Sequence, residues 1–213
     1  MHDQIEKLLL HPNLKVEVQS DPATISRQTL TYLAEWRKWN QKINLTSEKN
    51  ESRILQKHVF DSFQYGLAVD ADAVILDVGS GAGFPGIFLK VIFPRLKLVL
   101  VESQRKRANF LRNAVRAMKL DSIQVFDCRI EDLSADFHAQ FDFAVFRGVG
   151  SLDLCMGMAA PFLKPSGKVV VRKEPDASWA GNPEENYHIF KEVQVLSYEG
   201  VASKIMSFEK CST

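Results

Sequence analysis

The chain has 213 residues and a formal net charge of +1, with 46% apolar and 25% charged residues. These values are ordinary for a globular protein of one sizeable domain with an extension. No stretch approaches the ~20 apolar residues that span a bilayer, and the N-terminus lacks the features of a signal peptide. The near-zero charge excludes bulk charge as the basis of a nucleic-acid partnership, so such a role would need a local cluster.

The three cysteines are Cys128, Cys155 and Cys211. They form no CxxC pair and have no metal-ligand spacing with the five histidines. We therefore expect reduced thiols, a cytoplasmic protein and no metal site.

Residues 1–72 are expected to form a helical extension. Asp21 followed by Pro22 is a typical helix start, and apolar side chains then recur at helical spacing as far as Trp36. The segment 39–46 breaks this pattern, and a second helix is expected from Glu51 to Ala68. A lone histidine on the inward face of that helix, His58, is more often structural than a ligand.

Residues 73–213 alternate strand and helix patterns, which is typical of an α/β fold with a mostly parallel, Rossmann-like sheet. A closing antiparallel pair is expected near the C-terminus, and the best loop candidate is 177–186. The expected strands are Val74–Val78, Leu96–Val101, Ile123–Phe126, Phe141–Phe146, Lys168–Val171, Val193–Tyr198 and Lys204–Glu209.

A glycine-rich loop follows the first of these strands and gives the chain its main functional signal. Its frame is Asp77-x-Gly79-x-Gly81-x-Gly83, with Pro85 expected at the first helical position. So many glycines indicate a ligand lying against the backbone. An overlapping frame, Gly81-x-Gly83-x-x-Gly86, is a literal but weak dinucleotide fingerprint. Glu102 ends the second strand 23 residues after Gly79, a spacing suited to an acid that holds ribose hydroxyls.

Basic residues recur just after the strands, where ligands bind in such sheets. The groups are Arg105, Lys106 and Arg107 after the second strand, Arg147 after the fourth, and Arg172 with Lys173 after the fifth. The first group also opposes the preference of helix N-termini for acids. A polyanionic substrate would explain this rim of positive charge, although ordinary solvated charges remain an alternative.

Several segments together resemble one family, the bacterial 16S ribosomal RNA guanine-N7 methyltransferases of the RsmG (GidB) type. They are Trp39–Thr46, Lys57–Ser62, Asp77–Gly86, Glu102–Arg107 and Arg147–Leu152. The resemblance implies a class I fold dependent on S-adenosylmethionine (SAM), with a seven-stranded mostly parallel sheet and an N-terminal helical extension. It also implies a cytoplasmic monomer whose partner is 16S ribosomal RNA or a small-subunit precursor, with guanine 527 as the family's target.

Carried over residue by residue, the resemblance implies a SAM site that needs no acid or base catalyst. Arg147 would position the reactants and close the site. The cofactor-binding residues would be Asp77, Gly79, Gly81, Gly83, Phe84, Glu102, Ile130, Glu131 and Arg147, and the RNA-binding residues Arg105, Lys106, Arg107, Arg172 and Lys173.

The sequence departs from the family pattern at Phe146-Arg147-Gly148, Pro165-Ser166-Gly167 and Phe60–Phe63, which concerns the shape of the base pocket. Three other functions stay open at this point. They are an NAD-dependent oxidoreductase, a non-catalytic RNA-binding or ribosome-assembly factor, and a small-molecule methyltransferase.

Overall fold

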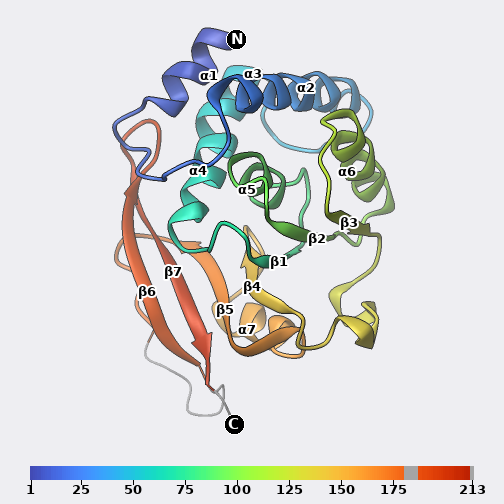
Figure 1. Cartoon of the computed structure of the whole chain (residues 1–213), viewed down its shortest axis with the longest axis vertical. Coiled ribbons are helices and arrows are strands. Elements are labelled where there is room, and N and C mark those ends of the chain that lie inside the picture. Colours follow the sequence, from blue (N-terminus) through green and yellow to red (C-terminus); the bar gives the residue numbers. More distant parts are fainter. Residues whose placement is uncertain (180–186, 212–213) are drawn as a thin grey trace.

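The computed structural model describes residues 1–179 and 187–211, so part of the expected 177–186 loop lies outside the described residues. One seven-stranded sheet in the order β3-β2-β1-β4-β5-β7-β6 forms its centre (Figure 1). The pairs among β1 to β5 are parallel, and β7 runs antiparallel between β5 and β6. The strands are β1 (Val74–Val78), β2 (Lys97–Val101), β3 (Ile123–Phe126), β4 (Phe141–Phe146), β5 (Leu163–Lys173), β6 (Tyr187–Leu196) and β7 (Ala202–Lys210).

Helices cover both faces of the sheet because the central strands are apolar on both sides. Ile75 of β1 packs with the N-terminal helices, α5 and α6, whereas its neighbour Leu76 packs with α7 on the opposite face. The helices are α1 (His2–Leu9), α2 (Pro22–Asn40), α3 (Glu51–Arg53), the π-helix η1 (Ile54–Val59), α4 (Phe60–Gln64), the 3₁₀ turn η2 (Tyr65–Leu67), α5 (Gly86–Ile92), α6 (Arg105–Ala117), the 3₁₀ turns η3 (Ile130–Asp132) and η4 (Ala135–Phe137), and α7 (Leu152–Ala159).

The expected α/β fold is confirmed, with differences at several element boundaries. The helical segment 51–67 is continuous, but its middle is wound as a π-helix. α5 begins at Gly86, so Pro85 occupies the N-cap position instead of the first helical position. β5 starts at Leu163, so Pro165–Gly167, which were expected to form a turn before the strand, lie within it. Ser166 there has a φ of 59°, and the register against β4 shifts.

The N-terminal helices lie over the face of the sheet that also carries α5 and α6 (Figure 1). Side chains of α1 and α2, such as Leu8, Ile25 and Trp36, belong to the same hydrophobic cluster as Ile75 of the sheet. The division of the chain near residue 72 stays a prediction. Among the described residues, none of the helices is both long and apolar enough to cross a bilayer.

Candidate functional site

The register of the parallel strands brings the expected site residues to one edge of the sheet. Val78 of β1 pairs with Val101 of β2 and with Phe146 of β4. The next residues along these three strands, Gly79, Glu102 and Arg147, therefore emerge side by side at the carboxyl edge. This is the edge at which open α/β sheets bind their ligands.

The glycine loop is held at both ends by hydrogen bonds. The N–H groups of Gly79 and Ser80 donate to Val101 O at 2.9 and 3.1 Å. At the far end, Gly86 N donates to Asp77 Oδ2 at 2.8 Å, so the strand residue Asp77 closes the loop onto the start of α5. A larger residue at position 86 would force a neighbour to shift, because a Cβ there would lie 2.4 Å from Asp77 Oδ2 and 2.9 Å from Leu100 Cδ2.

Asp77 is almost fully buried, at 1% exposure. Burial is the main cause that raises its pKa to about 7, with the nearby Glu102 charge adding to the rise, although the bond from Gly86 opposes it. Among the described residues, its second oxygen, Oδ1, has no hydrogen-bond partner. The carboxyl group therefore orders the loop and keeps one polar atom for another contact.

Glu102 connects the glycine loop to α6. Its Oε2 accepts from Gly81 N at 2.9 Å, and its Oε1 accepts from Gln104 N at 2.8 Å, in front of the first turn of α6. The acid thus binds the N–H of the N-cap residue, Gln104, whose own side chain makes no cap bond. A carboxylate has about four acceptor sites, so two backbone bonds leave capacity for ribose hydroxyls.

A hollow of about 140 Å³ opens where β1 and β2 end. Apolar residues form much of its wall, and Ser103, Arg129 and Glu131 add polar groups, a mixture typical of small-molecule sites. It is lined by Val78, Gly79, Val101, Ser103, Cys128, Arg129, Ile130, Glu131, Val149 and Met158. Gly79, Ile130 and Glu131 of the expected cofactor site thus lie together around one cavity.

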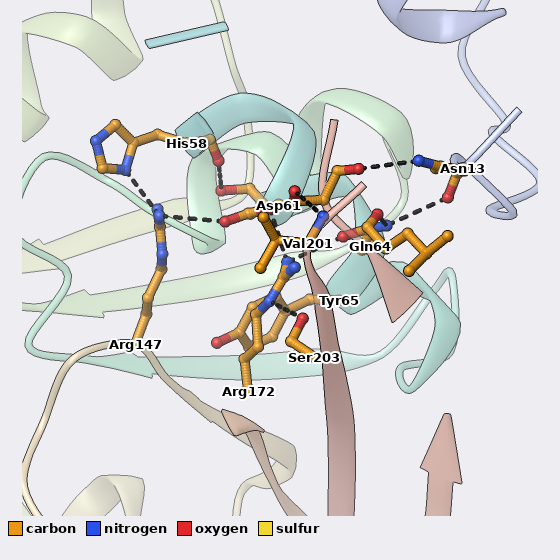
Figure 2. Close-up of polar contacts among 12 residues, drawn as sticks. Asn13, His58, Asp61, Gln64, Tyr65, Arg147, Arg172, Val201 and Ser203 are labelled. Atoms are coloured by element: carbon orange, nitrogen blue, oxygen red, sulfur yellow. Dashed lines mark hydrogen bonds and ion pairs between the residues drawn. The ribbon is translucent and has the colours of Figure 1, made fainter. Parts of the chain in front are cut away.

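Arg147 is held by groups that the sequence pattern alone does not connect to it. Its Nη2 lies 2.7 Å from Nδ1 of His58, 89 residues away in the chain, and 3.8 Å from Oδ2 of Asp61 (Figure 2). An arginine only donates, so His58 is neutral, accepts through Nδ1 and carries its proton on Nε2. Burial first, and then the Arg147 charge, lower the pKa of His58 to about 4.

Arg172 is oriented toward the interior of this network. Its Nη1 lies 2.8 Å from Asp61 Oδ1 and donates to Gln64 Oε1 at 2.9 Å, and its Nε donates to Ser203 Oγ at 2.8 Å (Figure 2). Only 14% of its side chain is exposed. Burial raises the pKa of Asp61, and the two guanidiniums oppose that shift. Arg172 therefore serves as an internal ion-pair partner, with little exposed surface left for an RNA contact.

Phe84 lies outside the residues that line the small hollow and belongs to an aromatic cluster under the glycine loop. Its ring stacks on His58 at 5.0 Å and contacts Tyr32 edge-on at 5.7 Å, and the Arg147 guanidinium lies 5.4 Å from its centre. Tyr32 of α2 donates to Ala82 O at 2.6 Å, so the N-terminal helices hold the loop directly. Phe84 thus connects the loop to both Arg147 and the N-terminal extension.

The cations that follow β2 project from the first turn of α6, which contains no acidic residue. Arg105 and Lys106 are exposed, and neither makes a hydrogen bond or ion pair with another described residue. Arg107 is half-buried and donates to Asn44 O at 3.3 Å. Lys173, at the end of β5, is half-buried and pairs in register with Lys204 of β7.

A parallel sheet continued by an antiparallel β7, with a glycine loop after β1 and an acid after β2, defines the class of SAM-dependent methyltransferases. The solved structures agree on the fold. A SAM-dependent methyltransferase from Aquifex aeolicus matches with a TM-score of 0.58 and 14% identity, over 78% of this chain and 96% of that chain.

Comparison with sequence families gives the particular family. The model described as GidB, rRNA small subunit methyltransferase G, matches residues 25–207. Proteins named ribosomal RNA small subunit methyltransferase G from Geobacter sp. and Dictyoglomus thermophilum are 35% and 33% identical. These matches cover 84% and 83% of this chain, and 82% and 75% of the two relatives. The chain belongs to this family and is a methyltransferase.

Proposed function

We propose that the protein transfers the methyl group of SAM to N7 of a guanine in 16S ribosomal RNA, and that it acts as a cytoplasmic monomer. The observation that carries the proposal is the glycine-loop site of an rRNA methyltransferase family with exposed cations beside it. Phosphate contacts by such cations supply much of the affinity for RNA.

SAM, when bound, supplies an electrophilic methyl carbon on a sulfonium. Guanine N7 has a free lone pair and no proton, so it would receive this methyl group without losing a proton, and the thioether form of the cofactor would leave. No base is required, which fits a site whose histidine is neutral and already used to hold Arg147. The side chains contribute by positioning guanine N7 against the methyl carbon, which lowers the barrier by up to ~7–11 kcal/mol when these atoms are well aligned.

The geometry supports the individual roles that we propose. Gly79, Ile130 and Glu131 line the hollow proposed for the adenosine, and Glu102 is proposed to add the ribose contact. Arg147, held by His58 and placed near Phe84, is proposed to position the reactants at the end of β4. N7 faces the deep, narrow major groove of an RNA helix, so an unpaired or splayed guanine is the proposed target.

The direct test is transfer of a tritiated methyl group to ribosomal RNA from cells that lack the protein, followed by nucleoside analysis. The expected product is 7-methylguanosine in 16S RNA. A label on another RNA or another atom would contradict the proposal, and retained RNA affinity without transfer would favour an assembly factor.

The RNA surface is tested with Arg105→Glu/Lys106→Glu, which reverses the two exposed cations at the start of α6. Methylation should fall at least ~10-fold at moderate salt while SAM affinity is unchanged. Arg116→Glu/Lys119→Glu is the matched control, because it makes the same charge change at two exposed residues at and just beyond the other end of the same helix. Equal effects of the two changes would remove this surface from the proposal.

A further inference from the structure

A second, larger hollow lies beside the start of α6. It measures about 710 Å³, within the range of small-molecule sites. Its walls come from the last turns of α2, the segment 41–50 and the first turn of α6. It is lined by Trp36, Arg37, Asn40, Gln41, Asn44, Leu45, Thr46, Ser47, Lys49 and Arg107.

The wall formed by segment 41–50 is built by specific hydrogen bonds. Asn40 Oδ1 accepts from the N–H groups of Leu45 and Thr46 at 2.9 and 3.2 Å. Trp36 Nε1 donates to Thr46 Oγ1 at 3.2 Å. The polar atoms of α2 that face the segment are therefore used to fix its shape.

Other polar groups around the hollow remain available. The side chains of Gln41, Asn44 and Lys49 are exposed and make no hydrogen bond with another described residue. An amide both donates and accepts, so it can match the edges of different bases. The lining thus offers free hydrogen-bonding groups beside the apolar side chains of Trp36 and Leu45, which are 2% and 5% exposed.

The charge of the lining is entirely positive. Arg37, Lys49 and Arg107 line the hollow, and none of its described lining residues is acidic. Glu51 neutralises Arg37, at 2.5 Å. Lys49 and Arg107 have no such partner among the described residues, so the hollow keeps an excess of positive charge.

The position of the hollow connects it to the methyl-transfer site. Tyr32, which holds the glycine loop, lies one helical turn before Trp36 on α2, about 6 Å along the axis. Glu48 of the same segment accepts from Lys57, the neighbour of His58, at 2.9 Å. The hollow therefore adjoins the first turn of α6, and its walls are tied through α2 to the glycine loop and through Glu48 to the helix that carries His58.

We propose that this hollow binds one unpaired nucleotide of the RNA substrate, next to the guanine that is methylated. The proposal rests on the proposed function and adds a second contact point to it. The positive lining takes the phosphate, the amides of Gln41 and Asn44 take the base edge, and Trp36 and Leu45 lie beside the base. Single-stranded bases are recognised by this combination of charge, amide contacts and apolar surface.

The kinetic test uses Lys49→Glu and Asn44→Ala, whose side chains are exposed and unbonded, so neither change disturbs the fold. Arg107 and Arg37 are left unchanged, because one belongs to the α6 surface and the other pairs with Glu51. Lys42→Glu is the matched control. It has the same charge change on the same segment, but Lys42 lines a different hollow, with Glu35 and Arg116.

For Lys49→Glu, the KM for RNA should rise about tenfold, with kcat, SAM affinity and melting temperature unchanged. Asn44→Ala should alter KM by a smaller factor, and Lys42→Glu should stay within about threefold of the parent. If Lys49→Glu and Asn44→Ala behave like Lys42→Glu while the parent methylates RNA normally, the hollow is not an RNA site and the proposed function still stands.

Photo-crosslinking gives a readout independent of turnover. Ultraviolet irradiation of the parent protein with the unmethylated RNA should attach a nucleotide to the tryptic peptide Ile43–Lys49, and excess nucleoside monophosphate should compete weakly. Crosslinks confined to the start of α6 would overturn the proposal. Full competition by a free nucleotide at micromolar concentration would overturn it too, in favour of a separate nucleotide site.

Discussion

Gly86→Ala tests whether the contact between β1 and the start of α5 sets the shape of the glycine loop. The added Cβ would lie 2.4 Å from Asp77 Oδ2 and 2.9 Å from Leu100 Cδ2, whereas carbon contacts are ordinarily ~3.5–4.0 Å. Overpacking of this kind costs about 1–3 kcal/mol. If the carboxylate moves away, the Gly86 N–H also loses its bond, at a further cost of about 1–3 kcal/mol.

Alanine favours a helix over glycine by up to ~1 kcal/mol, which offsets part of this loss. We therefore expect Gly86→Ala to lower the free energy of unfolding by about 2–4 kcal/mol. Urea denaturation followed by circular dichroism measures this loss, and calorimetry should show SAM binding weakened about tenfold.

Gly157→Ala is the matched control, because Gly157 lies in α7 and a Cβ there meets nothing within 4 Å. It should be neutral or stabilising by up to ~1 kcal/mol. A loss below about 1 kcal/mol for Gly86→Ala, or an equal loss for both variants, would refute the role assigned to the Asp77 contact.

Three further predictions concern the side chains around the loop. Glu102→Ala should weaken SAM binding several-fold by calorimetry, because it removes the anchor of Gly81 N; unchanged affinity would exclude Glu102 from the cofactor site. Asp61→Asn should lower the free energy of unfolding by about 3–5 kcal/mol, because it leaves buried guanidiniums without their anion; a loss under 1 kcal/mol would contradict the network. The pKa of His58 is about 4 in the folded state, below its ordinary value of 6.5. Neutral His58 therefore contributes to the free energy of unfolding above pH 6.5, and this contribution is lost as the pH falls toward 4. His58→Asn should remove this share, so the difference between its denaturation midpoint and that of the parent should change across this window; a constant difference would refute the assignment.

The central strands could be predicted from the sequence with great accuracy. Val74–Val78 and Phe141–Phe146 have the same bounds in the structure, because strands buried on both faces form short apolar runs between clear turn signals. The edge strand Ile123–Phe126 also keeps its expected bounds, although it is only partly buried. The segment that forms the helix α7 has no such apolar run between clear turn signals, and the sequence did not predict this helix. β6 is also longer than expected, since its N-terminal half is mostly exposed and its adjacent Ile189 and Phe190 break the apolar–polar alternation of a half-buried strand.

The site could be predicted only where local sequence determines it. The glycine loop and Glu102 are adjacent in space because parallel strands align their carboxyl ends. A sequence motif is therefore enough to predict that they lie close together. The contact between His58 and Arg147 joins two segments 89 residues apart, and a single histidine on a helix gives no signal for it. Arg172 comes directly after the apolar residues of β5, where a basic residue at the ligand-binding edge of the sheet would be expected. The strand continues past it, however, and its partners Asp61 and Ser203 come from elsewhere in the chain.

The hydrogen bond from Tyr32 to Ala82 O joins the helical extension to the glycine loop, which limits how such proteins can diversify. Tyr32 is fully buried and its burial raises the pKa of the phenol, so its hydroxyl stays a donor to Ala82 O at all physiological pH values. A recombination that exchanged the first 72 residues for those of another enzyme would leave this carbonyl and the Phe84 ring without their partners. We therefore expect the extension and the loop to be inherited together, and a chimera to work only when both come from the same parent.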